Sequence, residues 1–249
     1  MSKRALSILT LSILQAVCAF AGVRHFTYLY EAPTSPPGSI ESENWMTWAH
    51  VDNPEHSDEL AFRHEIEIGI TERFQASVYF VDWSYHNDPT SSGFKYSDSG
   101  LELIYNLSNP VADPVGLSIY QEYKGGDRLF EWESKVIAQK NYGRWIFAYN
   151  ATLEAVWQGE GLSGREGEFS QALGASYEID PQLSVGLEFL QEFVFPNWRD
   201  TEEVRNVFVG PNVSYRRNQW FVTVTALAQA TDTEDEPNFQ LRTIFGVGF

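Results

Sequence analysis

The closing stretch of the chain, residues 237–249, most constrains what this sequence can fold into. Apolar side chains fall on alternate positions, and mostly polar residues or glycines fall between them. The apolar set is Phe239, Leu241, Phe245, Val247 and Phe249. A period of two places one face of a β-strand in an apolar medium and the other in a polar one. Since a β-sandwich in water shows the same alternation, the stretch predicts a strand but leaves its surroundings open.

The end of this strand resembles the C-terminal assembly signal of bacterial outer-membrane β-barrels, in which a final aromatic residue closes an alternating strand. The residues that match are Phe245, Val247 and Phe249. The resemblance implies a place in the outer membrane of a Gram-negative-type bacterium. It also implies that the barrel assembly machinery is a partner of the chain.

The start of the chain predicts an export signal over residues 1–21. Residues 1–4 are cationic, residues 5–17 are mostly apolar, and residues 19–21 form a small-x-small cleavage site. The only cysteine, Cys18, is expected to leave with this signal. The mature chain is therefore expected to have neither disulfides nor thiolate chemistry.

Between these ends, alternation and turn residues predict an all-β fold, a transmembrane antiparallel β-barrel of about 12 strands. Residues 22–38, which are rich in turn formers, are expected to form a periplasmic lead-in, and residues 39–249 the barrel. Every second connection is short. If both termini are periplasmic, the short connections face the periplasm and the mostly longer ones face outward.

Aromatic residues near the strand ends predict two girdles at the membrane interfaces. Aromatic residues make up 15% of the chain. Trp145 and Trp157 would lie about 28 to 30 Å apart along the membrane normal, at roughly 3.3 Å per residue and a tilt of about 40 to 45°. The predicted girdle residues are Phe74, Trp145, Trp157, Phe193, Trp220 and Phe249. The alternative is that these aromatics fill the core of a soluble protein.

Several segments are similar to a little-characterised family of predicted bacterial outer-membrane β-barrel proteins, classed as a domain of unknown function. The segments that carry the resemblance are 26–28, 43–45, 65–75, 109–110 and 209–216. The resemblance spans nearly the whole mature chain and implies a barrel and its location. It brings no activity and no catalytic residue.

The polar faces of the strands predict a lumen with more acids than bases. The expected lumen-lining charges are Arg63, Glu65, Glu67, Glu102, Glu122, Glu131, Glu133, Lys135, Arg144, Glu154, Glu188, Glu192 and Arg242. Two interpretations stay open: a cation-preferring pore, or a barrel filled by acids and bases that pair across it. With 34 acidic against 17 basic residues, the chain suits neutral or cationic solutes and ions that bridge to lipopolysaccharide, and not nucleic acid.

Histidines and acids gather in the first two predicted outer loops. They are His50, Asp52, Glu55, His56, Asp58, His86 and Asp88. Such side chains bind a metal, or pair to activate water as in the outer-membrane omptin proteases. Their spacing is loose and no His-x-x-x-His lies on a predicted strand, which favours solvated loop residues. No metal, cofactor or catalytic residue is therefore expected.

These patterns most simply predict a non-enzymatic, porin-like channel or uptake protein for small neutral or cationic solutes, surrounded by outer-membrane lipid and lipopolysaccharide. Two alternatives remain. One is an outer-membrane enzyme with an Asp/His site on the extracellular rim, and the other is a structural or adhesive barrel.

Overall fold

The computed structural model describes residues 22, 24–52, 56–199, 204–234 and 236–249. The expected export signal, residues 1–21, and the predicted rim residue Glu55 lie outside the described residues. No helix in the described ranges is long and apolar enough to cross a membrane.

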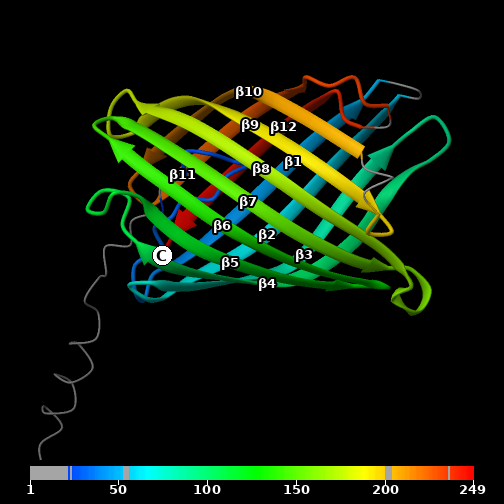
Figure 1. Cartoon of the computed structure of the whole chain (residues 1–249), viewed down its shortest axis with the longest axis horizontal. Helices are drawn as coiled ribbons and strands as arrows, with labels where there is room; N and C mark the ends of the chain where they lie inside the picture. The colour runs from blue at the N-terminus through cyan, green and yellow to red at the C-terminus, as the bar shows by residue number, and fades with distance from the viewer. Residues whose placement is uncertain (1–21, 23, 53–55, 200–203, 235) are drawn as a thin grey trace, which may run out of the picture.

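The described residues form a closed antiparallel β-barrel in which every strand pairs with its neighbours in sequence and β1 pairs with β12 (Figure 1). The predicted fold class and the predicted number of strands are confirmed. The strands are β1 (Ile40–Val51), β2 (Ser57–Thr71), β3 (Phe74–Asn87), β4 (Ser92–Ser108), β5 (Gly116–Gly126), β6 (Leu129–Tyr142), β7 (Trp145–Gln158), β8 (Gly164–Glu178), β9 (Leu183–Pro196), β10 (Val204–Arg217), β11 (Trp220–Gln229) and β12 (Phe239–Gly248).

Alternation along the strands separates an apolar outer face from the lumen. On β7, Trp145 and Phe147 are exposed on the outer face, whereas Ile146 and Ala148 are buried on the inner face. A barrel in lipid needs this pattern because its backbone groups are all paired between strands and only its outward side chains meet hydrocarbon. The closing seam is complete, since the Phe249 N–H donates to the Ile40 carbonyl at 2.9 Å.

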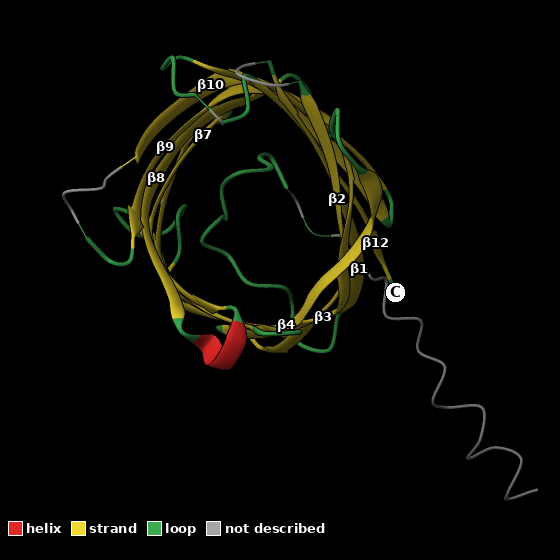
Figure 2. Ribbon diagram, turned by 90° about the vertical axis from the view of Figure 1, so that its right-hand side faces the viewer, coloured by secondary structure: helices red, strands yellow, loops and turns green. Residues whose placement is uncertain are grey.

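The two ends of the barrel differ in their connections. At the end where β1 begins and β12 ends, adjacent strands are joined by turns as short as two residues, and Gly143 and Asn218 take left-handed conformations there. We call this the turn end. The opposite end, the loop end, has mostly longer connections, including a loop with a short 3-10 helix, η1 (Glu160–Leu162), drawn red in Figure 2.

Residues 24–38 run inside the barrel, where Figure 2 shows non-strand chain crossing the ring of strands. We call this segment the plug. Phe26, Leu29 and Ala32 in it are buried, with at most 1% of their surface exposed. The expectation of a lead-in outside the barrel is thereby corrected. Turn-rich composition indicated an irregular segment, but did not show that its apolar side chains have a place to bury within the lumen.

Candidate functional site

Lumen side chains bind the backbone N–H groups of the plug in place of a strand partner. The Glu188 carboxylate accepts from the N–H groups of Thr27 and Tyr28 at 3.0 and 2.7 Å. Three side-chain amide oxygens accept from Tyr30, Ala32 and Ser35 in the same way; they belong to Asn150 at 2.7 Å, Gln139 at 2.7 Å and Gln75 at 2.9 Å. A buried N–H left without an acceptor would cost about 1 to 3 kcal/mol, so these polar wall residues hold an irregular segment that an apolar wall would reject.

Wall side chains also donate to the plug carbonyls. The Ala32 carbonyl accepts from Asn106 at 2.7 Å and from Ser118 at 2.5 Å. All twelve strands contribute a polar contact to the plug, through Glu43, Glu67, Gln75, Asn106, Ser118, Gln139, Asn150, Glu178, Glu188, Ser214, Thr223 and Gln240 in chain order. The plug is therefore fastened around the full circumference of the barrel.

An apolar seat on β7 to β11 receives the side chains of Phe26 and Leu29. It consists of the buried residues Ile146, Ala148, Ala172, Leu190, Phe208 and Leu227. Gly174 lies beside this seat, and a Cβ there would come within 2.5 Å of the Phe26 ring. Close packing in a protein interior leaves no room for such an atom, so this glycine makes space for the plug.

Two cavities lie beside the plug in the described part of the lumen. One, of about 310 Å³, lies toward the loop end and is lined by groups including Arg63, Glu122 and Lys124. The other, of about 470 Å³, lies toward the turn end and is lined by groups including Glu41 and Glu67. Tyr30 of the plug lines both, so the plug forms the partition between them.

Ion pairs fill part of the lumen. Arg63 pairs with Asp82 at 2.9 Å, Lys135 with Glu133 at 2.8 Å, and Arg24 of the plug with Glu43 at 2.9 Å. Two further pairs join Lys124 to Glu122 at 2.7 Å and to Glu131 at 2.6 Å. These pairs join four bases to five acids, which is the kind of pairing that one of the two interpretations of the sequence expected.

A row of glutamates runs across the wall, one on each of the strands β4 to β8. Each stands directly opposite the next in register; they are Glu102, Glu122, Glu133, Glu154 and Glu168. Like charges placed directly opposite repel each other. Lys124 pairs with Glu122 and Lys135 with Glu133 in the middle of the row, whereas no described base forms an ion pair with Glu102, Glu154 or Glu168. Glu168 was not among the lumen residues predicted from the sequence. Pairing residues across the β7–β8 hairpin would have identified it, because that register puts Glu168 opposite Glu154.

The structure places the predicted charges on the inner face of the strands with one exception. Arg144 lies in the turn between β6 and β7, is exposed, and holds its guanidinium carbon 5.0 Å from the centre of the Tyr177 ring. The prediction that Arg144 lines the lumen was wrong, because β6 ends at Tyr142 and Arg144 lies beyond it. The charges on the inner face are Arg63, Glu65, Glu67, Glu102, Glu122, Glu131, Glu133, Lys135, Glu154, Glu188, Glu192 and Arg242.

The predicted girdle aromatics lie at the two ends of the barrel. Phe74, Trp145, Trp220 and Phe249 lie at the turn end, and Trp157 and Phe193 at the loop end. Tyr177 of β8 and Trp198 of the turn after β9 extend the two groups: between ring centres, Tyr177 lies 4.9 Å from Trp145, and Trp198 lies 5.4 Å from Trp157.

In the plug, burial lowers the pKa of His25, but the carboxylates of Glu31 and Glu178 outweigh it and hold this pKa above its ordinary value. The His25 Nδ1 lies 2.9 Å from Glu31, and its Nε2 lies 3.6 Å from Glu178 on β8. Arg216 opposes the rise. When it is protonated, the His25 ring ties the plug to β8 near the turn end.

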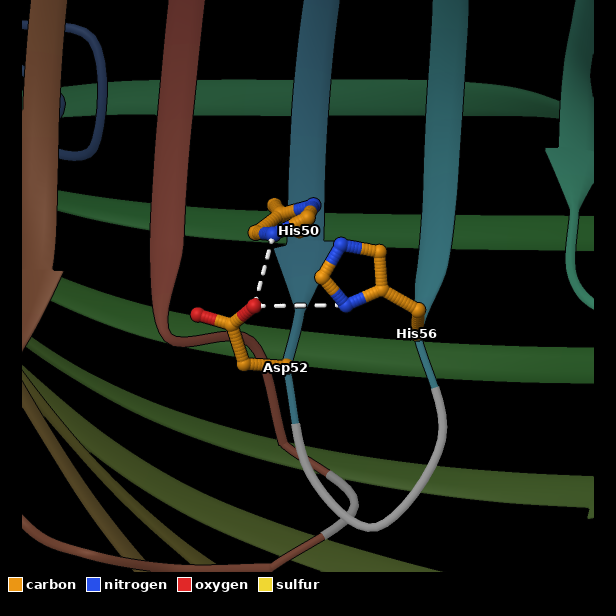
Figure 3. Close-up of side chains that lie close together, drawn as sticks. All are labelled: His50, Asp52 and His56. Atoms are coloured by element: carbon orange, nitrogen blue, oxygen red, sulfur yellow. Dashed lines mark hydrogen bonds and ion pairs between the residues drawn. The ribbon is translucent and has the colours of Figure 1, made fainter.

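At the loop end, the structure brings part of the predicted rim group together (Figure 3). The Asp52 Oδ1 atom lies 3.2 Å from His50 Nε2 and 3.3 Å from His56 Nδ1, and Asp58 lies 2.8 Å from His50 Nδ1. His86 and Asp88 form contacts in their own loop instead: His86 Nε2 lies 3.3 Å from the Ser91 hydroxyl.

A family model described as "Family of unknown function (DUF6662)" matches residues 18–240. No curated protein matches the chain.

Solved outer-membrane barrels resemble it in fold. The COG4313 outer membrane channel from Pseudomonas putida F1 is 10% identical with a TM-score of 0.67, over 88% of this chain and 98% of that chain. The NanC porin is 9% identical with a TM-score of 0.54, over 84% and 98%. The translocator domain of the autotransporter NalP from Neisseria meningitidis is 10% identical with a TM-score of 0.55, over 99% and 93%. At these identities the likeness establishes the barrel fold alone.

Proposed function

Because this chain belongs to the family of unknown function DUF6662, whose description names no activity, we propose a function from the lumen itself: a gated outer-membrane channel for small neutral or cationic solutes. The observation that carries the proposal is the plug, an irregular segment that separates two lumen cavities of about 310 and 470 Å³. With the plug in place the passage is closed, and its displacement joins the two cavities.

The attachment of the plug suits a reversible gate. Its N–H groups at Thr27, Tyr28, Tyr30, Ala32 and Ser35 are held by side chains and not by strand pairing. The Gly38 N–H donates to the Gly69 carbonyl of β2 where the plug joins the barrel, so the part of the plug before it leaves without breaking a ladder. Each such hydrogen bond contributes about 0.5 to 1.5 kcal/mol in exchange with water. Water that enters the lumen replaces these partners one for one.

The wall also supports a preference for cations. Glu154 and Glu168, two of the three glutamates of the row with which no described base forms an ion pair, face the lumen on β7 and β8. Rings or rows of carboxylates raise the local concentration of cations and exclude anions in pores.

The location and orientation are part of the same proposal. The apolar outer face contacts outer-membrane lipid, the turn end with both chain termini faces the periplasm, and the loop end contacts lipopolysaccharide. Phe245, Val247 and Phe249 are read by the barrel assembly machinery. Thiol reagents applied to intact cells should label Ser163→Cys at the loop end and spare Val111→Cys at the turn end; the reverse pattern would contradict this orientation.

Conductance in planar bilayers tests the channel. The full mature chain should conduct weakly or in rare openings, and a variant that lacks residues 24–37 should conduct several-fold more because the two cavities then join. In a salt gradient the reversal potential should show a preference for cations. The double substitution Glu154→Gln with Glu168→Gln should reduce that preference, and Glu160→Gln in the exposed loop is the matched control. A plug-deleted barrel that folds but does not conduct would refute the channel.

A further inference from the structure

Three side chains of types that can bind metal ions, two histidines and an aspartate, lie close together at the loop end of the barrel. His50 comes from the end of β1, Asp52 from the residue after that strand, and His56 from the residue before β2 (Figure 3). Each of the three side chains offers one ligand atom, and these three atoms all lie within 4.8 Å of one another. Antiparallel pairing of β1 and β2 brings the end of β1 next to the start of β2, and so places these residues side by side.

The spacing of these atoms fits a tetrahedral metal ion. Zinc binds His nitrogens and carboxylate oxygens at about 2.0 to 2.2 Å, which places neighbouring ligand atoms about 3.3 Å apart on the edge of a tetrahedron. The separations from Asp52 Oδ1 to His50 Nε2 and to His56 Nδ1 are 3.2 and 3.3 Å. Two edges of the tetrahedron therefore already have the required length. The His50 and His56 rings are nearly perpendicular, with their centres 4.9 Å apart.

A second carboxylate, that of Asp58, orients the His50 ring through its Nδ1 atom. Asp58, directly opposite His50 in the β1–β2 register, lies 2.8 Å from His50 Nδ1. The indole N–H of Trp48 donates to the same Asp58 oxygen at 2.8 Å and holds it in place. A carboxylate on one ring nitrogen directs the lone pair of the other nitrogen outward, as metal-binding histidines require. In this chain the other nitrogen, Nε2, is the one that faces Asp52 and His56.

The neighbouring loop fixes the backbone of the cluster. The Asp52 N–H donates to the Asn238 side chain at 2.6 Å, and the Asn238 N–H donates to the His50 carbonyl at 2.8 Å. Asn238 immediately precedes β12, so the seam between the first and last strands supports both His50 and Asp52. These ligands are held before any ion arrives, which lowers the entropic cost of binding.

From this geometry we propose that the rim of the barrel carries a binding site for a divalent transition-metal ion of the zinc type. His50 Nε2, His56 Nδ1 and Asp52 are its ligands, and Asp58 is a positioning residue. Water completes a tetrahedron around the ion. Two imidazoles among three ligands select against Ca²⁺ and Mg²⁺, which take oxygen ligands. A bound ion closes the β1–β2 hairpin, and through Asn238 it also secures the β1–β12 seam. The site does not depend on whether the barrel conducts.

Metal titration of the full mature chain in detergent micelles, without an affinity tag, tests the site. Zn²⁺ should bind at one ion per chain, and Co²⁺ should give the visible absorption bands of a tetrahedral centre. His56→Ala, which removes an exposed ligand at little risk to folding, should weaken Zn²⁺ affinity by at least tenfold, and so should His50→Ala. Asp58→Asn should weaken it about 10 to 100-fold while the Co²⁺ bands keep their shape, because the three ligands remain.

His86→Ala is the matched control, since His86 is a histidine at the same end of the barrel that lies outside the cluster, and it should bind Zn²⁺ as the unaltered chain does. Excess Ca²⁺ should not displace Zn²⁺. Unaltered affinity in either the His50 or the His56 variant, an equal loss in the His86 variant, or displacement by Ca²⁺ would each overturn the site. Heat-modifiable migration on gels verifies that every variant compared is a folded barrel.

Discussion

The apolar seat on β7 to β11 and the polar residues of the lumen wall hold the same plug by different means. The seat buries Phe26 and Leu29 beside Gly174. Polar side chains around the barrel, such as Glu188 and Gln139, bind the plug through hydrogen bonds. Burial has no preferred direction, whereas hydrogen bonds fix direction and register. The apolar contacts therefore supply most of the affinity for the plug, and the polar contacts determine its path.

The largest expected effect comes from blocking the apolar seat. Gly174→Leu places atoms where the Phe26 ring lies, since a Cβ alone comes within 2.5 Å of that ring. The plug should be displaced and bilayer conductance should rise several-fold, close to that of the plug-deleted chain. Gly125→Leu is the control, because a Cβ at Gly125 meets nothing within 4 Å. If Gly174→Leu left conductance at the level of this control, the apolar seat would not hold the plug.

A smaller effect should follow from removing one polar anchor. Glu188→Ala takes the acceptor from the N–H groups of Thr27 and Tyr28, which should weaken plug docking by about 1 to 3 kcal/mol. Hydrogen exchange measured by mass spectrometry should quicken in a peptide that contains both residues. Glu192→Ala lies on the same face of β9 and should leave that exchange unchanged. Equal protection in both variants would mean that hydrogen bonding does not determine the path of the plug.

The smallest effect is expected from pH, through His25. Its pKa is raised in the folded protein, so its contribution to docking is complete below the ordinary value of about 6.5 and is lost as the pH rises through the raised value. Channel opening should therefore become more frequent as the pH increases through this window. His25→Gln should abolish the dependence, and His86→Gln should preserve it. More frequent opening at lower pH would contradict the assigned sign.

The outer wall of the barrel could be predicted from sequence because it depends on local pattern. Alternation in residues 145–157 and short turns such as the one at Asn218 indicate strands and their order without reference to the rest of the chain. The lumen depends on which residues face each other across strands. The position of Glu168 opposite Glu154, for example, follows only from the β7–β8 register.

The plug and the rim were harder to predict for related reasons. Residues 24–38 have no periodicity, and their place is set by contacts with residues as distant in sequence as Gln240. His50 and Asp58 were expected in an outer loop, but β1 continues to Val51 and pairs His50 with Asp58 of β2. The position of a strand end thus separates a loose set of loop residues from a compact cluster.

Protection of a thiol at Ala32 tests most directly whether the plug occupies the lumen. Ala32 has no exposed surface, and its carbonyl is bound by Asn106 and Ser118. In the folded barrel Ala32→Cys should react with a soluble maleimide far more slowly than Val111→Cys, which replaces a residue that is 70% exposed, and denaturation should equalise the two rates. Equal rates in the folded barrel would contradict a docked plug, and with it the gate on which the proposed channel depends.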